Sequence, residues 1–351
     1  MDCFPADADG KISVKCLRFY ETGEPKKVLR LDHVMLKTSL EPNEVLIKYQ
    51  AATILPAHIN IIEGTYAIKP VLPAIPGNEA VGIVEKIGSS VKTLAPCDKV
   101  VPLSSKGAWT EYEVQREDNC FKIDPSIDIG TAATFLSNPI TAWKMLQNYI
   151  KLEKGDLVVQ NLANSHCGQS VIQIAKALGY KTINIVRNRP QIDQLKRELR
   201  QMGADYVYTE EEFVNVSKNF QKYFKSQPKL ALNGTGGKSS LALAGCLAES
   251  GLMLVYGGMS KQPHQIPTAA LLFKNIRVVG VPAGYYLRPE NKKERLEILA
   301  KIHDLAIKRQ LTGPKMEFVP IERFMDAIDK TMSGRNLKQL LILDPVIGSR
   351  L

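Results

Sequence analysis

The chain has 351 residues, of which 44% are hydrophobic and 7% aromatic, and it carries a formal net charge of +10. This length and apolar content predict a large core and two domains. The basic residues are spread along the chain without a dense block, so nucleic acid is a poor candidate partner. An acidic ligand, such as a phosphorylated cofactor or an acidic carrier protein, fits this charge better.

The cysteines and the apolar segments exclude further classes of protein. The six cysteines are scattered without a C-x-x-C pair, which predicts reduced, mostly buried thiols rather than a disulfide framework or a zinc knuckle. They are Cys3, Cys16, Cys97, Cys120, Cys167 and Cys246. The most apolar region, residues 241–259, is interrupted by Glu249-Ser250-Gly251 and predicts a helix and a strand, not a membrane span. The first ten residues carry three acids and no basic residue, the opposite of a transit peptide.

Residues 1–137 predict a β-rich domain, because many short strands are separated by Gly and Pro. Pro56 opens a short helix through Ile62, and Gly64-Thr65-Tyr66 then begins a loop. A helix over residues 131–149, interrupted at Pro139, leads out of this domain. The predicted strands cover residues 11–20, 43–53, 80–87, 99–103 and 110–114.

Residues 138–312 alternate between strand and helix, which predicts a parallel sheet covered by helices on both faces. Residues 313–351 return to short elements and are predicted to rejoin the first domain. The predicted strands are residues 157–159, 181–186, 206–208, 230–232, 252–256 and 276–279. After the helix that ends at residue 178, the predicted helices are residues 192–202, 211–224, 239–247 and 294–310.

The first strand–turn–helix–strand unit of this region, residues 155–186, predicts a dinucleotide site. The backbone N–H groups that open such a helix face a pyrophosphate. A full G-x-G-x-x-G is absent, and Gly168 alone stands where the chain is expected to pass close to phosphate. On this turn alone, an ordinary βαβ unit without a ligand remains an open alternative.

The second strand of the unit ends in Arg187-Asn188-Arg189-Pro190, where an NAD-binding unit would place an acid on the ribose 2′-hydroxyl. Two guanidiniums can instead bind a 2′-phosphate, which favours NADPH over NADH. The alternative is that both arginines form a solvated patch at a helix start. Glycines at residues 234, 236, 237, 257 and 258 also follow predicted strands, where they either admit a cofactor or form simple turns.

Metal chemistry and nucleophilic triads are not indicated. Gly77-Asn78-Glu79 has no His or Cys at a suitable spacing, and His58, His166 and His264 are isolated. Tyr66 remains as a candidate proton donor, although loop tyrosines commonly serve packing or hydrogen bonding.

With these residues in view, the chain resembles the zinc-less medium-chain dehydrogenase/reductases, and within them the mitochondrial trans-2-enoyl-CoA (enoyl-acyl-carrier-protein) reductases. The resemblance implies a GroES-like substrate domain and a doubly wound Rossmann domain, an active site in the cleft, a homodimer and a mitochondrial location. The matching segments are residues 59–66, 76–82, 138–142, 183–190, 232–240 and 256–263.

The resemblance also implies site residues. Tyr66 matches the catalytic tyrosine of the family. Val281-Pro282-Ala283-Gly284 corresponds by position to a further cofactor segment. The implied NADPH-binding residues are Asn138, Asn164, Ser165, His166, Cys167, Arg187, Asn188, Arg189, Tyr256, Gly257, Gly258, Met259 and Lys338.

The implied reaction fits these residues. A hydride attacks the β-carbon of a 2-enoyl thioester and leaves negative charge on the thioester oxygen. The hydroxyl of Tyr66 can hydrogen-bond this charge or protonate the α-carbon, and neither step needs a metal.

The chain departs from the family pattern at three places. The family's Ser-Gly-Val-Gly turn is Ser165-His166-Cys167-Gly168, its Pro-Ser-Asp is Pro56-Ala57-His58, and its Phe-Trp-Leu-Ser is the segment at residues 281–284. We expect the first departure to narrow the phosphate turn and the second to change the polar lining next to Tyr66.

The leading hypothesis is therefore an NADPH-dependent reductase of trans-2-enoyl thioesters in fatty-acid synthesis, acting on acyl-carrier-protein or CoA substrates. A quinone or enone oxidoreductase of the same fold is the second. A non-catalytic nucleotide-binding or carrier-binding module is the third, and nucleic-acid binding is the least favoured.

Overall fold

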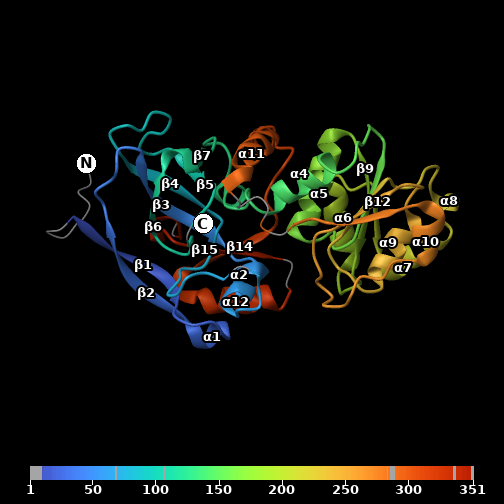
Figure 1. The fold of residues 1–351 in the computed structure, drawn as a ribbon, viewed down its shortest axis with the longest axis horizontal. Helices are drawn as coiled ribbons and strands as arrows, with labels where there is room; N and C mark the ends of the chain where they lie inside the picture. Colours follow the sequence, from blue (N-terminus) through green and yellow to red (C-terminus); the bar gives the residue numbers. More distant parts are fainter. Residues whose placement is uncertain are drawn as a thin grey trace. The chain divides into compact units, whose positions relative to one another are not determined.

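The computed structural model describes residues 10–67, 69–105, 107–282, 284, 289–334 and 337–348 (Figure 1). The chain divides into two compact units. The first unit comprises residues 1–137 and 312–351, and the second unit comprises residues 138–311.

The first unit contains a seven-stranded sheet in the order β14-β15-β3-β4-β5-β7, with β6 paired to β3. All pairs are antiparallel except β14 with β15. The predicted strands from residue 43 to residue 114 are confirmed to within two residues at each end. The strands are β3 (Glu44–Thr53), β4 (Ala80–Ile87), β5 (Lys99–Pro102), β6 (Tyr112–Arg116), β7 (Cys120–Lys122), β14 (Met316–Pro320) and β15 (Lys338–Ile342).

A separate hairpin of β1 (Lys11–Phe19) and β2 (Leu29–Lys37) joins this sheet through single bridges, Cys16 to Thr110 and Phe19 to Ala74. The sequence predicted β1 but missed β2. In β2 the first residue alone is buried, and the others are half-buried or exposed. Buried and exposed residues therefore alternate only weakly along β2. A clear alternation is the signal that identifies a strand in a sequence.

The core of the first unit surrounds Trp109, which is fully buried and donates its Nε1–H to the carbonyl oxygen of Thr53 at 3.0 Å. Gly77 lies against the indole ring with a φ of +91°, so a side chain there would be strained and would collide with Trp109. The helices of this unit are α1 (Pro25–Val28), α2 (Pro56–Ile62), α3 (Ile129–Ala132), α12 (Phe324–Met332) and α13 (Pro345–Gly348).

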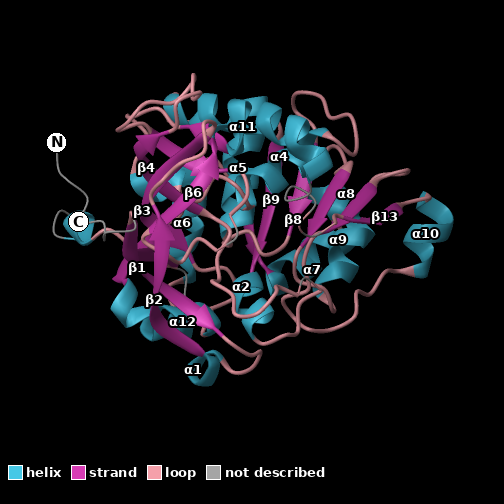
Figure 2. Cartoon of the chain, turned by 60° about the vertical axis from the view of Figure 1, so that its left-hand side comes forward, coloured by secondary structure: helices cyan, strands magenta, loops and turns pink. Residues whose placement is uncertain are grey.

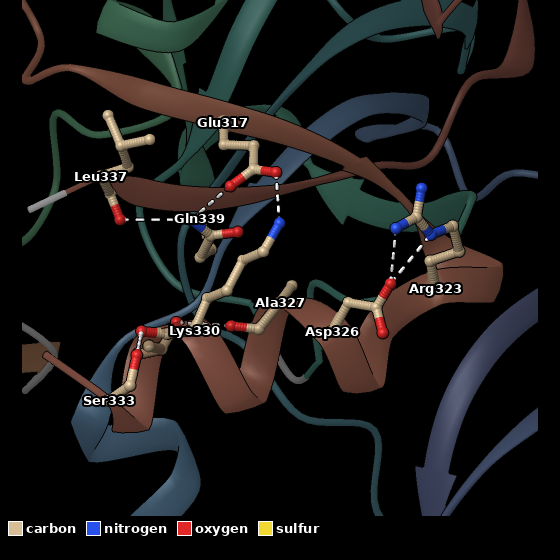
Figure 3. Close-up of polar contacts among 9 residues, drawn as sticks. Glu317, Arg323, Asp326, Ala327, Lys330, Ser333, Leu337 and Gln339 are labelled. Atoms are coloured by element: carbon tan, nitrogen blue, oxygen red, sulfur yellow. Dashed lines mark hydrogen bonds and ion pairs between the residues drawn. The ribbon is translucent and has the colours of Figure 1, made fainter. Parts of the chain in front are cut away.

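Polar contacts tie α12 to the returning strands (Figure 3). Glu317 on β14 forms an ion pair with Lys330 on α12 and accepts from Nε2 of Gln339 on β15 at 3.2 Å. At the start of α12, the side chain of Asp326 accepts from Arg323, the residue that precedes the helix, at 2.6 and 2.9 Å. Since β15 also pairs with β3, these contacts keep the C-terminal segment in the unit where the chain begins.

The second unit contains a six-stranded parallel sheet in the order β10-β9-β8-β11-β12-β13. Figure 2 labels β8, β9 and β13 of this sheet. Its strands are β8 (Leu157–Gln160), β9 (Lys181–Val186), β10 (Tyr206–Thr209), β11 (Leu230–Asn233), β12 (Leu252–Val255) and β13 (Arg277–Gly280). Its helices are α4 (Asn138–Gln147), α5 (His166–Leu178), α6 (Ile192–Met202), α7 (Glu210–Lys218), α8 (Phe220–Tyr223), α9 (Ser239–Cys246), α10 (Thr268–Lys274) and α11 (Lys292–Ile307).

Helices cover both faces of this sheet, as predicted. Ile183 and Ile185 of β9 pack in one cluster with Phe213 of α7, whereas Val186 packs in another with Ile172 of α5. This chain therefore has the expected fold class, a β-rich unit and a doubly wound parallel sheet.

Two predicted helices are wrong in extent. Residues 131–149 form α3 and α4 with a break between them, and Pro139 stands in the first turn of α4, where proline is tolerated. Residues 211–224 break at Asn219, whose φ of −122° is not helical. Besides β2, the sequence missed α1, β7 and α10, which are short, and it gave no bounds for the short elements after residue 313. No described helix is long and apolar enough to cross a membrane.

Candidate functional site

The turn between β8 and α5 presents a helix N-terminus. Ser165 is the N-cap: its hydroxyl accepts from the backbone N–H of Gly168 at 3.1 Å, and its carbonyl accepts from that of Gln169 at 2.8 Å. The first turn of a helix leaves N–H groups without intrahelical partners and carries partial positive charge. The turn therefore has the electrostatics that bind a pyrophosphate.

Gly168 has a packing role that the sequence alone did not indicate. A Cβ at this position would lie 2.7 Å from the Cα of Ala163 and from the carbonyl oxygens of Leu162 and Ala163. Gln160 also donates its side-chain N–H to the carbonyl oxygen of Gly168 at 3.0 Å. Gly168 thus lets α5 pack closely against the end of β8, which is a known role of glycine in dinucleotide-binding turns.

Two residues of the turn, His166 and Cys167, replace family residues. His166 has a hydrogen-bond partner in the second unit, and Cys167 is buried there. The Nδ1 of His166 accepts from Nδ2 of Asn138 at 3.0 Å, which ties the ring to the start of α4. Cys167 is 5% exposed, and burial raises its pKa to about 12, so the thiol stays neutral. The carbonyl of Asn164 accepts from the side chain of Gln169 at 2.9 Å. The N-terminus of α5 is therefore intact without the family's glycine.

Two like charges meet at the end of β9. Arg187 and Asn188 are exposed and Arg189 is half-buried, with its Nε donating to the carbonyl oxygen of Arg187 at 3.3 Å. Burial, and then the neighbouring positive charge of Arg187, lower the pKa of Arg189. A pair of guanidiniums brought together in this way is suited to a doubly charged anion such as a phosphate monoester.

The loop after β12 carries the predicted residues from Tyr256 to Met259. The Tyr256 hydroxyl is buried and forms no hydrogen bond within the described residues, although Ser165 lies near it. Burial raises the pKa of this hydroxyl well above its usual value. A Cβ on Gly258 would meet no described atom within 4 Å, so a ligand can approach the backbone there.

The segment at residues 281–284, which corresponds by position to a cofactor segment of the family, is only partly described. The N–H of Val281 donates to the carbonyl oxygen of Val255 at 2.8 Å and continues the pairing of β13 with β12. Pro282 is exposed and Gly284 half-buried, whereas Ala283 lies outside the described residues.

Lys338 lies in the first unit, at the start of β15, and donates from Nζ to the carbonyl oxygen of Ile54 at 2.8 Å. Burial lowers the pKa of Lys338 to about 8, while the charge of Glu79 opposes this shift. Glu79 is 1% exposed: its carboxylate accepts from the Thr53 hydroxyl at 2.9 Å and from the N–H of Ser137 at 2.8 Å. Burial raises the pKa of this carboxyl group.

Tyr66 also lies in the first unit, in the loop after α2. Gly64 ends the helix with a φ of +74°, and the N–H groups of Thr65 and Tyr66 then donate to the carbonyl oxygen of Asn60 at 2.9 and 3.1 Å. These bonds fix the backbone that carries the half-buried Tyr66 ring.

The sequence predicted that His58 changes the polar lining next to Tyr66, but the side chain is buried. Its side chain is 2% exposed, its Nδ1 accepts from the N–H of Leu55 at 3.3 Å, and its Nε2 contacts Oδ1 of Asn78 at 2.7 Å. The ring packs edge-on against Trp109 at 5.6 Å. His58 is therefore a hydrogen-bonded core residue.

Sequence reasoning missed two buried asparagines. Asn161 and Asn233 follow or end neighbouring apolar strands, and Nδ2 of Asn161 donates to Oδ1 of Asn233 at 2.9 Å. Asn233 also bonds to Nδ1 of His264 at 3.0 Å. The available signal was a polar residue at the carboxyl end of an apolar strand, where ligands of such sheets bind.

Comparison with known proteins agrees with this geometry. Residues 41–139 match the alcohol dehydrogenase GroES-like domain, and residues 167–301 match the zinc-binding dehydrogenase domain. The chain is 41% identical over 334 residues to a mitochondrial enoyl-[acyl-carrier-protein] reductase of Caenorhabditis elegans, covering 95% of this chain and 96% of the relative. The chain belongs to the mitochondrial enoyl-[acyl-carrier-protein] reductase family.

Solved structures extend the likeness. The Etr1p complex with NADP and crotonyl-CoA has a TM-score of 0.87 at 32% identity, covering 94% of this chain and 100% of that chain. The mitochondrial 2-enoyl thioester reductase Etr1p/Etr2p heterodimer from Candida tropicalis has the same TM-score, identity and coverage.

The zinc in the name of the matched domain does not fit this chain. Among the described residues, no group of three or more His, Cys, Asp or Glu side chains is placed to hold a metal ion. His58 bonds to Asn78, and Glu79 accepts from Thr53 and Ser137. The side chains of His58 and Glu79 are both buried. The described residues therefore do not fit a zinc ion, and the proposed reaction does not use one.

His58 predicts a pH-dependent loss of stability. Burial lowers its pKa from 6.5 to about 4, so the unfolded state binds the proton more tightly. The contribution of His58 to the free energy of unfolding is therefore fully present above about pH 6.5. It falls by about 3 kcal/mol as the pH drops towards 4. We expect urea unfolding of His58→Gln to lack this part of the pH dependence. Identical pH profiles for the variant and the wild type would contradict the assignment.

Proposed function

We propose that the protein uses NADPH to reduce the double bond of trans-2-enoyl thioesters. The observation that carries the proposal is the pair of guanidiniums, Arg187 and Arg189, at the end of the second strand of a dinucleotide-binding sheet. The membership of the enoyl reductase family supports this reaction over the quinone reductase alternative.

The residues of the second unit fit NADPH. The N-terminus of α5 suits the pyrophosphate, and Arg187 and Arg189 suit the 2′-phosphate. The buried Tyr256 hydroxyl has a free hydrogen-bonding capacity within the described residues. When bound, NADPH supplies a hydride. Lys338 remains a proposed cofactor contact by family resemblance.

Tyr66 is the proposed catalytic residue. After hydride addition at the β-carbon, negative charge develops on the thioester oxygen, and a proton must reach the α-carbon. A phenol donates a hydrogen bond to this oxygen or gives the proton itself. The hydrogen bonds to Asn60 hold the Tyr66 backbone in place for this role.

The acyl group is proposed to arrive on acyl carrier protein or coenzyme A, within mitochondrial fatty-acid synthesis. Either carrier is acidic, and the chain has a net charge of +10. The names of the relatives support the carrier protein and the compartment, and the Etr1p complex supports a CoA thioester.

We propose that the partner of the protein in solution is a second copy that pairs through β13. Strands of a parallel sheet are normally buried, yet all four residues of this edge strand are exposed. Val278 and Val279 are 39% and 38% exposed, and on the adjoining α10 Leu272 and Phe273 reach 71% and 82%. A two-fold axis would join equivalent β13 edges in antiparallel fashion and cover this apolar surface.

Replacing Tyr66 tests the chemistry. We expect Tyr66→Phe to lower kcat for trans-2-enoyl-CoA by about two to three orders of magnitude, because the enolate loses its donor, while NADPH affinity stays within about twofold. The rate is followed by NADPH oxidation. Tyr20→Phe, which removes an exposed hydroxyl bonded to Asp32, is the matched control. Wild-type activity in a folded Tyr66→Phe protein would rule out this role.

Replacing the two arginines tests cofactor choice. Each charge-assisted contact contributes about 1.5–3 kcal/mol, so we expect Arg187→Ala/Arg189→Ala to weaken NADPH binding about 100-fold or more and NADH binding little. Fluorescence titration with both nucleotides measures this. Arg197→Ala, an exposed arginine on α6, is the control. A parallel loss of both affinities would refute a 2′-phosphate site.

Charging the proposed dimer surface tests the partner. We expect light scattering to give a dimeric wild type and a monomeric Phe273→Glu, because the carboxylate cannot be buried in an apolar interface. Met35→Glu, at another exposed apolar residue, should remain dimeric. A monomeric wild type at micromolar concentration would contradict the proposal.

A further inference from the structure

Two buried amides hold the loop that follows β11. Asn161 and Asn233 are both 0% exposed and lie side by side at the ends of β8 and β11. Oδ1 of Asn161 accepts from the N–H groups of Gly234 at 2.8 Å and Thr235 at 3.3 Å. Oδ1 of Asn233 accepts from those of Thr235 at 3.3 Å and Gly236 at 3.0 Å. Successive backbone N–H groups of the loop thus end on two side chains.

The two amides also fix each other. Nδ2 of Asn161 donates to Oδ1 of Asn233 at 2.9 Å and to the Ser239 hydroxyl at 3.1 Å, at the start of α9. Nδ2 of Asn233 bonds to Nδ1 of His264 at 3.0 Å. Each position needs a donor and an acceptor on one short side chain, which asparagine provides and an aspartate or leucine does not.

The loop held in this way is in turn the support of the loop after β12. The carbonyl oxygens of Gly234 and Thr235 accept from the N–H groups of Met259 at 3.1 Å and Ser260 at 2.9 Å. The Tyr256 ring lies directly on Gly234: a Cβ there would be 2.7 Å from Cζ and Oη of the tyrosine. The position of the segment from Tyr256 to Met259 therefore depends on where Gly234 and Thr235 lie.

The strand order says which half of the cofactor this segment serves. A dinucleotide binds across the point where the strand order reverses, here between β8 and β11. Arg187 and Arg189 follow β9, on one side of that point, and suit the 2′-phosphate of the adenosine half. The loops after β11 and β12 lie on the other side and therefore serve the nicotinamide half.

We propose that Asn161 and Asn233 are positioning residues that place the Tyr256–Met259 segment for the nicotinamide half of NADPH. They act through Gly234 and Thr235 and do not touch the cofactor themselves. The inference rests on the proposed function, because it needs NADPH as the ligand of this sheet.

Paired titrations of two nucleotides test the inference. Adenosine 2′,5′-bisphosphate carries the adenosine half alone, so it reports on the arginine end of the site. We expect Asn161→Leu to raise the Kd of NADPH about tenfold or more, because buried N–H groups lose their acceptors and the loop shifts, while the Kd of the bisphosphate stays within about twofold. Leu230→Ala, at the other end of β11, controls for a general loss of stability.

A second variant leaves both asparagines in place. Gly234→Ala should push the Tyr256 ring aside and give the same selective loss of NADPH affinity. Gly245→Ala, on α9, is the matched control because its Cβ would meet no described atom within 4 Å. It should leave both affinities unchanged. This pair decides the question even if Asn161→Leu does not fold.

The outcomes separate the two proposals. A folded Asn161→Leu or Gly234→Ala that binds NADPH as the wild type does would overturn the inference and leave the proposed function standing. An equal loss of NADPH and bisphosphate affinity would do the same. A wild type that binds neither nucleotide would overturn the cofactor assignment, and the inference with it.

Discussion

The second unit depends on the close contact between α5 and the end of β8. Gly168 permits this contact, since any Cβ would meet the backbone of Leu162 and Ala163. The approach directs the N-terminal turn of α5 along the carboxyl edge of the sheet, where its N–H groups can serve an anion. Gln160 secures it by bonding to the Gly168 carbonyl and to Asn184 of the neighbouring strand. The turn before α5 thus accommodates His166 and Cys167, because its geometry depends on this packing and on the Ser165 cap.

Polar side chains at strand ends hold the loops of this unit and supply its charge. Asn161 and Asn233 satisfy loop N–H groups that the parallel sheet leaves unpaired, and a buried amide without a partner is costly. The end of β9 carries charge instead, since the exposed Arg187 lies near enough to the half-buried Arg189 for its positive charge to lower the pKa of Arg189. Rigid polar support on one side of the strand-order reversal and charge on the other match the two unequal halves of a phosphorylated dinucleotide.

The first unit uses buried ionisable groups for structure. Glu79 bonds to Thr53 and to the Ser137 backbone, and Lys338 lies near enough for its charge to matter to Glu79. His58 and Asn78 satisfy each other beside Trp109. The oxygens and nitrogens of these side chains therefore have hydrogen-bond partners inside the unit.

The sequence by itself determined the fold class, the alternation of the second unit and the placing of Arg187 and Arg189 at a strand end. These features depend on local periodicity and on residue type, which are written in short windows of the chain. It also indicated Tyr66 and the turn at Ser165, whose roles remain proposals. The tertiary structure alone decided that Gly168 serves helix packing, that His58 is a core residue, and that Asn161 accepts from the N–H of Gly234, 73 residues later in the chain. Each of these depends on which atoms meet across elements distant in sequence, and burial and hydrogen-bond partners of that kind leave no local pattern to read.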